Sequence, residues 1–182
     1  MIKKLLIANR GEIALRILRA CRELDIDTVA VYSEADRDQM HVKMADESIC
    51  IGPAEPNKSY LNIPAIISSM ELSGADGVHP GYGFLAENGD FAEQVEKSGF
   101  QFAGPSSDVI RIMGNKITAK KFAKDVGLPI LPDSNGPVSS NSKNLAEEIG
   151  YPIIIKAAAG GGGRDMRIVK SEEELENKLE IT

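Results

Sequence analysis

The chain contains 182 residues, and because globular domains mostly run to ~100–200 residues, this length predicts one domain plus a remainder. With 21 Lys and Arg against 27 Asp and Glu, the formal net charge is −6, which argues against a nucleic-acid partner, and no apolar run approaches the ~20 residues that span a bilayer. The two cysteines, Cys21 and Cys50, lie in apolar surroundings, which argues against a disulfide scaffold and favours a reducing, cytoplasmic location.

The first elements predict a strand–helix–strand unit. Residues 4–8 form a short unbroken apolar run that predicts a buried strand. After a turn at residues 9–11, apolar residues recur at helical spacing as far as Cys21, and residues 28–32 predict a second, β-branched strand. A strand, a helix and a strand within ~30 residues form a βαβ unit, whose crossover is right-handed.

The same pattern continues less strictly to about residue 103. Residues 48–51, 77–79 and 100–103 predict three further short strands. Helices are expected from Pro64, at a position that proline tolerates, and after Asn88, which is a good N-cap. Alternating strands and helices predict an α/β fold with an open, doubly wound parallel sheet.

The second part of the chain has a different character. Two helices, 106–113 and 116–126, are interrupted at Gly114 and Asn115, and residues 128–143 are typical of a linker or long loop. The elements expected beyond it are, in order, helix 145–149, strand 153–157, four glycines, strand 166–169 and helix 172–179. One hairpin with one or two helices buries too little apolar area to stand alone, so we expect a second domain that continues past residue 182.

The glycine run Gly160–Gly163 is a candidate phosphate-binding loop. Without β-carbons, its backbone N–H groups can approach phosphate oxygens closely, and Lys156 and Arg164 on either side can neutralise phosphate charge. The alternative is a mobile linker that binds nothing. The run is not a Walker loop, because no Gly-Lys-Ser/Thr follows it.

The turn after the first strand lacks a dinucleotide fingerprint. Only Gly11 of the G-x-G-x-x-G pattern is present, so close helix–strand packing explains Gly11 better than nucleotide binding. No acidic residue ends the second strand, although Glu34 is near. A nicotinamide-dependent oxidoreductase is therefore disfavoured.

Residues 79–88 leave the carboxyl end of a predicted strand, where open parallel sheets bind their ligands. Two glycines flank Tyr82 and would hold its ring at that crevice. His79 is more typical of a hydrogen-bonded structural residue, and Glu87 is also explained as an acid at a helix N-terminus. Lys116 opens a helix, where a cation is unfavourable, so it either meets an anionic ligand or lies in solvent.

Five stretches together resemble biotin carboxylase, the ATP-grasp component of acetyl-CoA carboxylase and related biotin-dependent carboxylases. They are IANRGEIA at 7–14, YLN at 60–62, HPGYGFL at 79–85, MGNK at 113–116 and IKA at 155–157. The resemblance covers essentially the whole chain. It implies a Rossmann-like, pre-ATP-grasp domain at 1–115, a connecting helix at 116–130 and the beginning of an ATP-grasp lid domain at 131–182.

The resemblance also implies a reaction. In that family ATP phosphorylates bicarbonate to carboxyphosphate, with Mg²⁺ or Mn²⁺ at the phosphates, and the CO2 passes to a ureido nitrogen of biotin on the biotin carboxyl carrier protein. A separate carboxyltransferase then uses the carboxyl group, and the full-length form is a homodimer. The stand-alone character of the chain favours acetyl-CoA carboxylase, in fatty acid synthesis, as the parent complex.

Site residues are implied position by position. Lys116 and Lys156 match the two ATP-phosphate lysines, and the other matches are the lid loop (Gly160, Gly161, Gly162, Gly163, Arg164 and Met166, the last near adenine), the active-site crevice (Tyr82 and Glu87) and the dimer interface (Arg19 and Glu23). The lid loop departs from the family at Ala159 and Asp165, where glycine is usual. The catalytic groups and metal ligands are expected beyond Thr182, so we expect the chain alone to lack biotin- and bicarbonate-dependent ATP hydrolysis.

Other functions stay open at this point. The chain could belong to the biotin carboxylase part of another acyl-CoA carboxylase or of a pyruvate carboxylase. A different ATP-grasp ligase is a further alternative, against which residues 79–88 argue. A non-catalytic dimerisation fragment that uses the first helix is the third.

Overall fold

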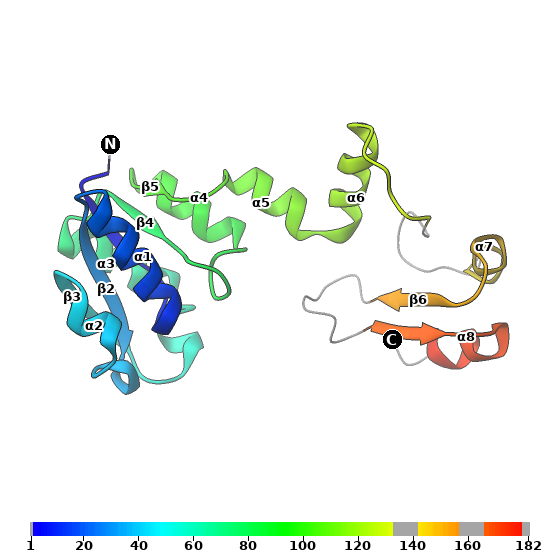
Figure 1. The fold of residues 1–182 in the computed structure, drawn as a ribbon, viewed down its shortest axis with the longest axis horizontal. Helices are drawn as coiled ribbons and strands as arrows, with labels where there is room; N and C mark the ends of the chain where they lie inside the picture. Colours follow the sequence, from blue (N-terminus) through cyan, green and yellow to red (C-terminus); the bar gives the residue numbers. More distant parts are fainter. Residues whose placement is uncertain (1, 133–141, 157–165, 180–182) are drawn as a thin grey trace. The chain divides into compact units, whose positions relative to one another are not determined.

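The computed structural model describes residues 2–132, 142–156 and 166–179. The chain divides into two compact units, Met1–Arg111 and Ile112–Thr182, and each is described by itself (Figure 1). Among the described residues, no helix is both long and apolar enough to cross a membrane.

The first unit is built on a parallel sheet. Its strands are β1 (Lys4–Ile7), β2 (Asp27–Ser33), β3 (Glu47–Gly52), β4 (Gly77–His79) and β5 (Gln101–Phe102). They are arranged in the order β3-β2-β1-β4-β5, and every neighbouring pair is parallel. The predicted α/β fold with a Rossmann-like parallel sheet is therefore confirmed.

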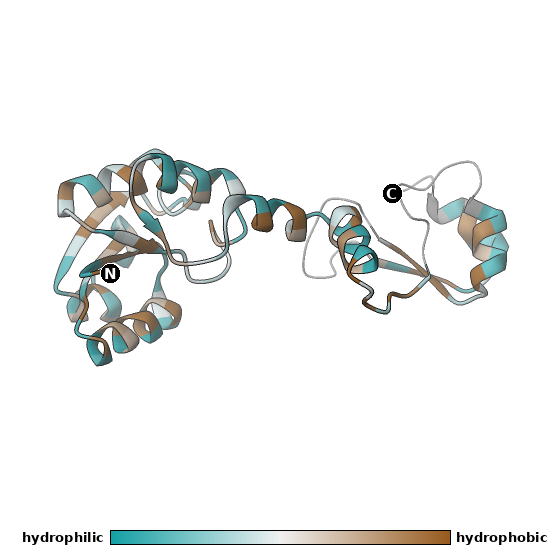
Figure 2. Ribbon diagram, turned by 90° about the horizontal axis from the view of Figure 1, so that it is seen from above, coloured by the Kyte–Doolittle hydropathy of each residue, from teal (hydrophilic) through white to brown (hydrophobic). Residues whose placement is uncertain are grey.

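Helices cover both faces of this sheet. They are α1 (Gly11–Glu23), α2 (Met40–Met44), α3 (Ile63–Ser73) and α4 (Gly89–Lys97), with short 3-10 turns η1 (Glu34–Asp36) and η2 (Pro56–Lys58). Bands of hydrophilic and hydrophobic residues alternate along these helices (Figure 2), as in amphipathic helices that bury one face. The predicted cap is confirmed, since the Asn88 side chain accepts a hydrogen bond from the N–H of Phe91 at 2.9 Å. The sequence did not indicate α2, which is too short to show a helical period.

The core explains why the strands are continuously apolar. On one face Leu6 of β1 and Val29 of β2 pack with residues of α3 and α4, such as Ile66 and Phe91. On the other face Ile7 packs with residues of α1, and Met44 of α2 joins them. Because successive residues of a strand point to opposite faces, a strand covered on both sides needs apolar residues at every position.

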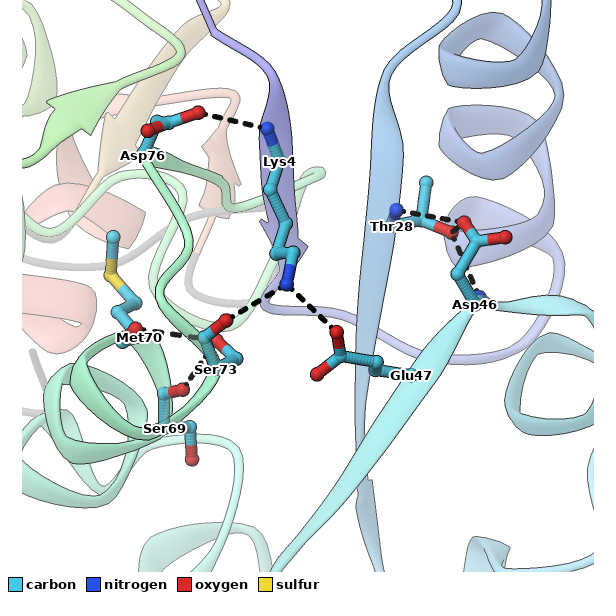
Figure 3. Close-up of polar contacts among 8 residues, drawn as sticks. All are labelled: Lys4, Thr28, Asp46, Glu47, Ser69, Met70, Ser73 and Asp76. Carbon is cyan, nitrogen blue, oxygen red and sulfur yellow. Dashed lines mark hydrogen bonds and ion pairs between the residues drawn. The ribbon is translucent and has the colours of Figure 1, made fainter.

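The amino edge of the sheet, where the parallel strands begin, is tied together by carboxylates (Figure 3). Asp76 Oδ2 accepts the backbone N–H of Lys3 at 2.7 Å and of Lys4 at 2.9 Å, and these bonds hold the pKa of Asp76 below its usual value. The Lys4 Nζ donates to Glu47 Oε1 at 2.8 Å and to the Ser73 carbonyl at 3.0 Å. These contacts join β1 to the starts of β3 and β4.

The second unit begins within helix α5 (Ser107–Gly114) and continues through α6 (Lys116–Asp125), α7 (Ser142–Ile149), β6 (Ile153–Lys156), β7 (Met166–Val169) and α8 (Glu172–Leu179). The expected break at Gly114–Asn115 is confirmed, because Asn115 Oδ1 caps α6 by accepting the N–H of Ile117 at 2.9 Å. Helix α7 begins at Ser142, earlier than predicted, so it includes the end of the expected linker.

Strands β6 and β7 form an antiparallel pair with one covered face. Ile155 and Val169 are buried against Ala146 of α7 and Leu175 of α8. On the opposite face Ile154, Met166 and Ile168 are 55%, 50% and 57% exposed. The hairpin therefore presents a continuous apolar face in addition to the one it buries in its own core.

Candidate functional site

The strand order identifies a switch point between β1 and β4. From β1 the chain adds β2 and then β3 on one side, and it returns to place β4 and β5 on the other side of β1. In open parallel sheets, ligands bind outside the carboxyl ends of the strands at such a reversal. The segments that leave β1 and β4, residues 8–11 and 80–88, are therefore the candidate site of the first unit.

Asn9 joins these two strand ends. Its side chain is buried, and Nδ2 donates to the carbonyl of Pro80 at 2.8 Å and to that of Tyr82 at 3.0 Å. The Oδ1 atom accepts the N–H of Arg10 at 2.9 Å, so both the nitrogen and the oxygen of the Asn9 amide are hydrogen-bonded. A buried carbonyl without a donor is costly, and Asn9 therefore fixes the first part of the loop that follows β4, as far as Tyr82.

The loop itself is tightly wound. Gly81 has φ +68, and a β-carbon there would lie 2.6 Å from Asn9 Nδ2 and 2.7 Å from Ile13 Cγ2, so only glycine fits. The N–H of Gly81 donates to His79 Nδ1 at 2.9 Å, and burial lowers the pKa of His79. These contacts agree with the expected structural role of His79, as a neutral hydrogen-bond acceptor.

Tyr82 projects from this loop. Its side chain is 65% exposed, and its hydroxyl donates to Glu12 Oε1 in the first turn of α1 at 3.1 Å. That hydrogen bond raises the pKa of Tyr82. Glu87 is exposed in the turn before α4, so both expected crevice residues belong to the segment that follows β4, and Tyr82 contacts the first turn of α1.

A buried carboxylate, Asp36, lies at the same edge of the sheet. Its Oδ2 accepts hydrogen bonds from Ser33 Oγ and Tyr60 OH, both at 2.7 Å, and pairs with Arg10 Nη1 at 3.2 Å. Burial acts to raise the pKa of Asp36, but these donors outweigh it and hold the pKa below the usual value. Sequence reasoning missed this group, since the acidic run 34–38 has the pattern of a solvated loop.

The expected ATP-binding residues belong to the second unit. Lys156 and Met166 are register partners at the ends of β6 and β7, so the hairpin brings them opposite each other. Lys116 is exposed at the first position of α6. The positions Gly160, Gly161, Gly162, Gly163 and Arg164, and the departures Ala159 and Asp165, lie outside the described residues.

The expected dimer-interface residues share one helix face. Arg19 and Glu23 are four residues apart on α1, and both are exposed. Residues at this spacing are neighbours on a helix surface. The buried residues of α1, which are Ala14, Leu18 and Cys21, face the sheet instead.

A metal centre does not emerge from the described ranges, which hold no group of three or more His, Cys, Asp or Glu side chains arranged to bind an ion.

Family models match both parts of the chain. Residues 1–110 match the model described as biotin carboxylase, N-terminal domain. Residues 115–182 match the model described as carbamoyl-phosphate synthase L chain, ATP binding domain. The two matches follow each other in the same order as the two units of the structure.

Curated relatives match the chain from end to end. The biotin carboxylase of Haemophilus influenzae is 64% identical, over 100% of this chain and 41% of its own length. A pyruvate carboxylase subunit of Methanothermobacter thermautotrophicus is 50% identical, over 100% of this chain and 38% of its own length. The chain thus spans about two fifths of the length of these relatives.

Solved structures give the same result. A biotin carboxylase complex with β,γ-ATP from Campylobacter jejuni matches 100% of this chain and 41% of its own, at 50% identity and a TM-score of 0.94. A biotin carboxylase domain dimer of the 2-oxoglutarate carboxylase from Hydrogenobacter thermophilus, with MgADP and bicarbonate, matches 100% of this chain and 40% of its own, at 49% identity and a TM-score of 0.93. With its first 110 residues matched by the family model, the chain belongs to the biotin carboxylase N-terminal domain family.

Proposed function

We propose that this chain supplies the N-terminal part of an ATP-dependent biotin carboxylase, which carboxylates biotin on a carrier protein with ATP and bicarbonate. The observation that carries the proposal is the match of the whole chain to a protein named biotin carboxylase at 64% identity. A parent complex of the acetyl-CoA carboxylase type, acting in the cytoplasm with a carrier protein and a carboxyltransferase, is part of the proposal.

The hairpin of the second unit supports nucleotide binding. An adenine ring binds against apolar side chains, and Ile154, Met166 and Ile168 supply such side chains on the exposed face of the hairpin. The backbone of Lys156 is opposite that of Met166, so a cation-bearing residue lies at the end of the same hairpin. Lys116, at the start of α6, supplies a second cation of the type that neutralises phosphate.

The described side chains do not fit a metal site by themselves. In the proposed reaction, the part of the first unit is to present Tyr82 and Glu87 to the crevice. The part of the second unit is to hold the nucleotide.

A chimera tests the proposal. Residues 1–182 of this chain replace the matching N-terminal part of the Haemophilus influenzae biotin carboxylase, which is 64% identical to it there. We expect ATP hydrolysis that requires bicarbonate and is stimulated by free biotin. A chimera that folds but hydrolyses ATP without any response to biotin would indicate a different ATP-grasp ligase and contradict the proposal.

The two lysines can be tested in the same chimera. Replacing Lys116→Met or Lys156→Met removes a cation from the proposed phosphate site, so we expect kcat/KM for ATP to fall by at least ~10²-fold. The matched control is Lys58→Met, which removes an exposed lysine paired with Glu55 in η2 and should leave kcat/KM unchanged. Equal losses in all three variants would contradict the assignment of the lysines.

Homodimerisation through α1 is a second part of the proposal, and it is supported by the exposed pair Arg19 and Glu23. Reversing a charge with Glu23→Arg should weaken the dimer of the chimera in sedimentation velocity measurements, whereas Glu71→Arg, on the exposed side of α3, should not. A dimer that Glu23→Arg leaves intact would exclude this face.

A further inference from the structure

We propose that Arg10 is a positioning residue, which clamps Phe84 and thereby fixes the loop that carries Tyr82. The inference rests on the proposed function in one respect, that Tyr82 is a crevice residue. It concerns how the fold holds this side chain, through Arg10, Asp36 and Tyr60.

Phe84 holds the far end of the loop in an unusual conformation. It has φ +41, in the left-handed region that side chains other than glycine rarely adopt. Its ring stacks on that of Tyr60, with the centroids 5.0 Å apart and an angle of 13° between the rings. Packing must therefore retain Phe84 in this conformation, because the backbone alone disfavours it.

The Arg10 guanidinium completes this packing. Its central carbon lies 5.4 Å from the Tyr60 ring centroid and 5.5 Å from the Phe84 centroid, both within the range of a cation–π contact. Asp36 directs the guanidinium through the 3.2 Å ion pair. The same carboxylate accepts the Tyr60 hydroxyl at 2.7 Å, so one buried group orients both partners of Phe84.

The loop is thus anchored on both sides of Tyr82. On the near side Asn9 binds the carbonyls of Pro80 and Tyr82, and on the far side Phe84 is held by Tyr60 and Arg10. The Asn9 amide reaches backbone atoms only as far as Tyr82, so it does not fix the path of the chain beyond that residue. The Arg10 clamp supplies that second anchor.

The test measures backbone order in the 182-residue chain and needs no ligand. Amide ¹⁵N relaxation should give order parameters of about 0.85 for Tyr82 and its neighbours in the unmodified chain, the value of a rigid backbone. Arg10→Lys keeps a charge for Asp36 but loses the planar contact with two rings. Phe84→Leu keeps Arg10 and Asp36 paired. In both variants we expect the order parameter of Tyr82 to fall below about 0.6.

The matched control is Arg22→Lys, an arginine of α1 whose Nη2 donates to the Met44 carbonyl at 2.6 Å. This variant should leave the loop rigid. A second readout is the pH at which the Tyr82 hydroxyl ionises, followed through its ring carbon shifts. Its pKa should fall towards the ordinary value in Arg10→Lys and Phe84→Leu, because a mobile loop loses the bond to Glu12.

Unchanged order at Tyr82 in either folded variant, or an equal loss in Arg22→Lys, would overturn the proposal. If Arg10→Lys does not fold, Phe84→Leu decides alone. A chimera without biotin-dependent activity would contradict the proposed function and leave this result standing.

Discussion

The two edges of the same parallel sheet are held together by different side chains. At the amino edge, carboxylates accept hydrogen bonds from backbone N–H groups, as Asp76 does from Lys3 and Lys4. At the carboxyl edge, the amide of Asn9 donates to the carbonyls of Pro80 and Tyr82. At each edge, side chains therefore pair backbone groups that would otherwise lack a partner.

The edges also differ in what they leave exposed. The amino-edge groups drawn in Figure 3 bind one another and the backbone. At the carboxyl edge, a buried hydrogen-bond network holds a loop whose Tyr82 is 65% exposed. A rigid exposed side chain over a buried polar support is the arrangement expected of a binding site. We therefore propose that both edges contribute to stability and that ligand contact belongs to the carboxyl edge.

Removing Asp36 should cause the largest loss of stability. Asp36→Ala leaves Arg10, Ser33 and Tyr60 without their acceptor. We expect the free energy of unfolding to fall by about 3 kcal/mol, the low end of the range for a broken buried ion pair, because Arg10 is partly exposed. Urea denaturation of the 182-residue chain measures it. A loss no larger than that of an exposed carboxylate would show that the carboxyl edge has no buried network.

Removing the Asn9 amide should have an intermediate effect. Asn9→Ala leaves two carbonyls and one N–H without partners, and the expected cost is about 2 kcal/mol. Asn9→Asp keeps the shape but places carboxylate oxygens against the carbonyls, so it should be at least as destabilising. Urea midpoints equal to that of the unmodified chain would contradict the role of Asn9 as the joint between β1 and β4.

Removing a carboxylate of the amino edge should lower the free energy of unfolding by a smaller amount. Asp46 accepts the N–H and the hydroxyl of Thr28, at 2.9 Å and 2.7 Å, but it is exposed. Asp46→Ala should therefore lower the free energy of unfolding by about 1 kcal/mol after allowance for solvent screening. A larger loss than that of Asp36→Ala would reverse the order of the two edges.

The amino edge should also make the stability of the protein depend on pH. The hydrogen bonds from Lys3 and Lys4 hold the pKa of Asp76 below its usual value, so its contribution is fully present above the unfolded pKa of about 3.9 and is lost as the pH falls through the folded pKa. Urea midpoints measured at about pH 6 and below pH 4 should differ less in Asp76→Asn than in the unmodified chain. An identical difference in both proteins would show that folding does not change the pKa of Asp76.

Much of the fold could be predicted because its signals are local. The five strands of the first unit appear as short apolar runs, and the interruption at Gly114–Asn115 appears as a helix breaker followed by a cap. Tyr82 lies in the loop after β4, as the sequence predicted, and its place at a ligand crevice stays a prediction. The assigned roles of Lys116, Lys156 and Met166 remain predictions.

The support beneath the loop could not be predicted, because its partners are far apart in the chain. Asp36 meets Arg10 and Tyr60, which are 26 and 24 residues away. Within its own sequence neighbourhood Asp36 resembles its exposed acidic neighbours. His41 is buried in the same way on a helix too short to show a period. Only the folded sheet brings these groups together.

The most direct test compares kcat/KM for biotin between variants of the two edges in the chimera. Tyr82→Ala removes an exposed side chain of the carboxyl edge, and Asp76→Asn alters the amino edge. We predict that Tyr82→Ala lowers kcat/KM for biotin at least ~10-fold with an unchanged urea midpoint, whereas Asp76→Asn leaves kcat/KM unchanged. Equal kcat/KM values for the two variants would contradict the assignment of ligand contact to the carboxyl edge.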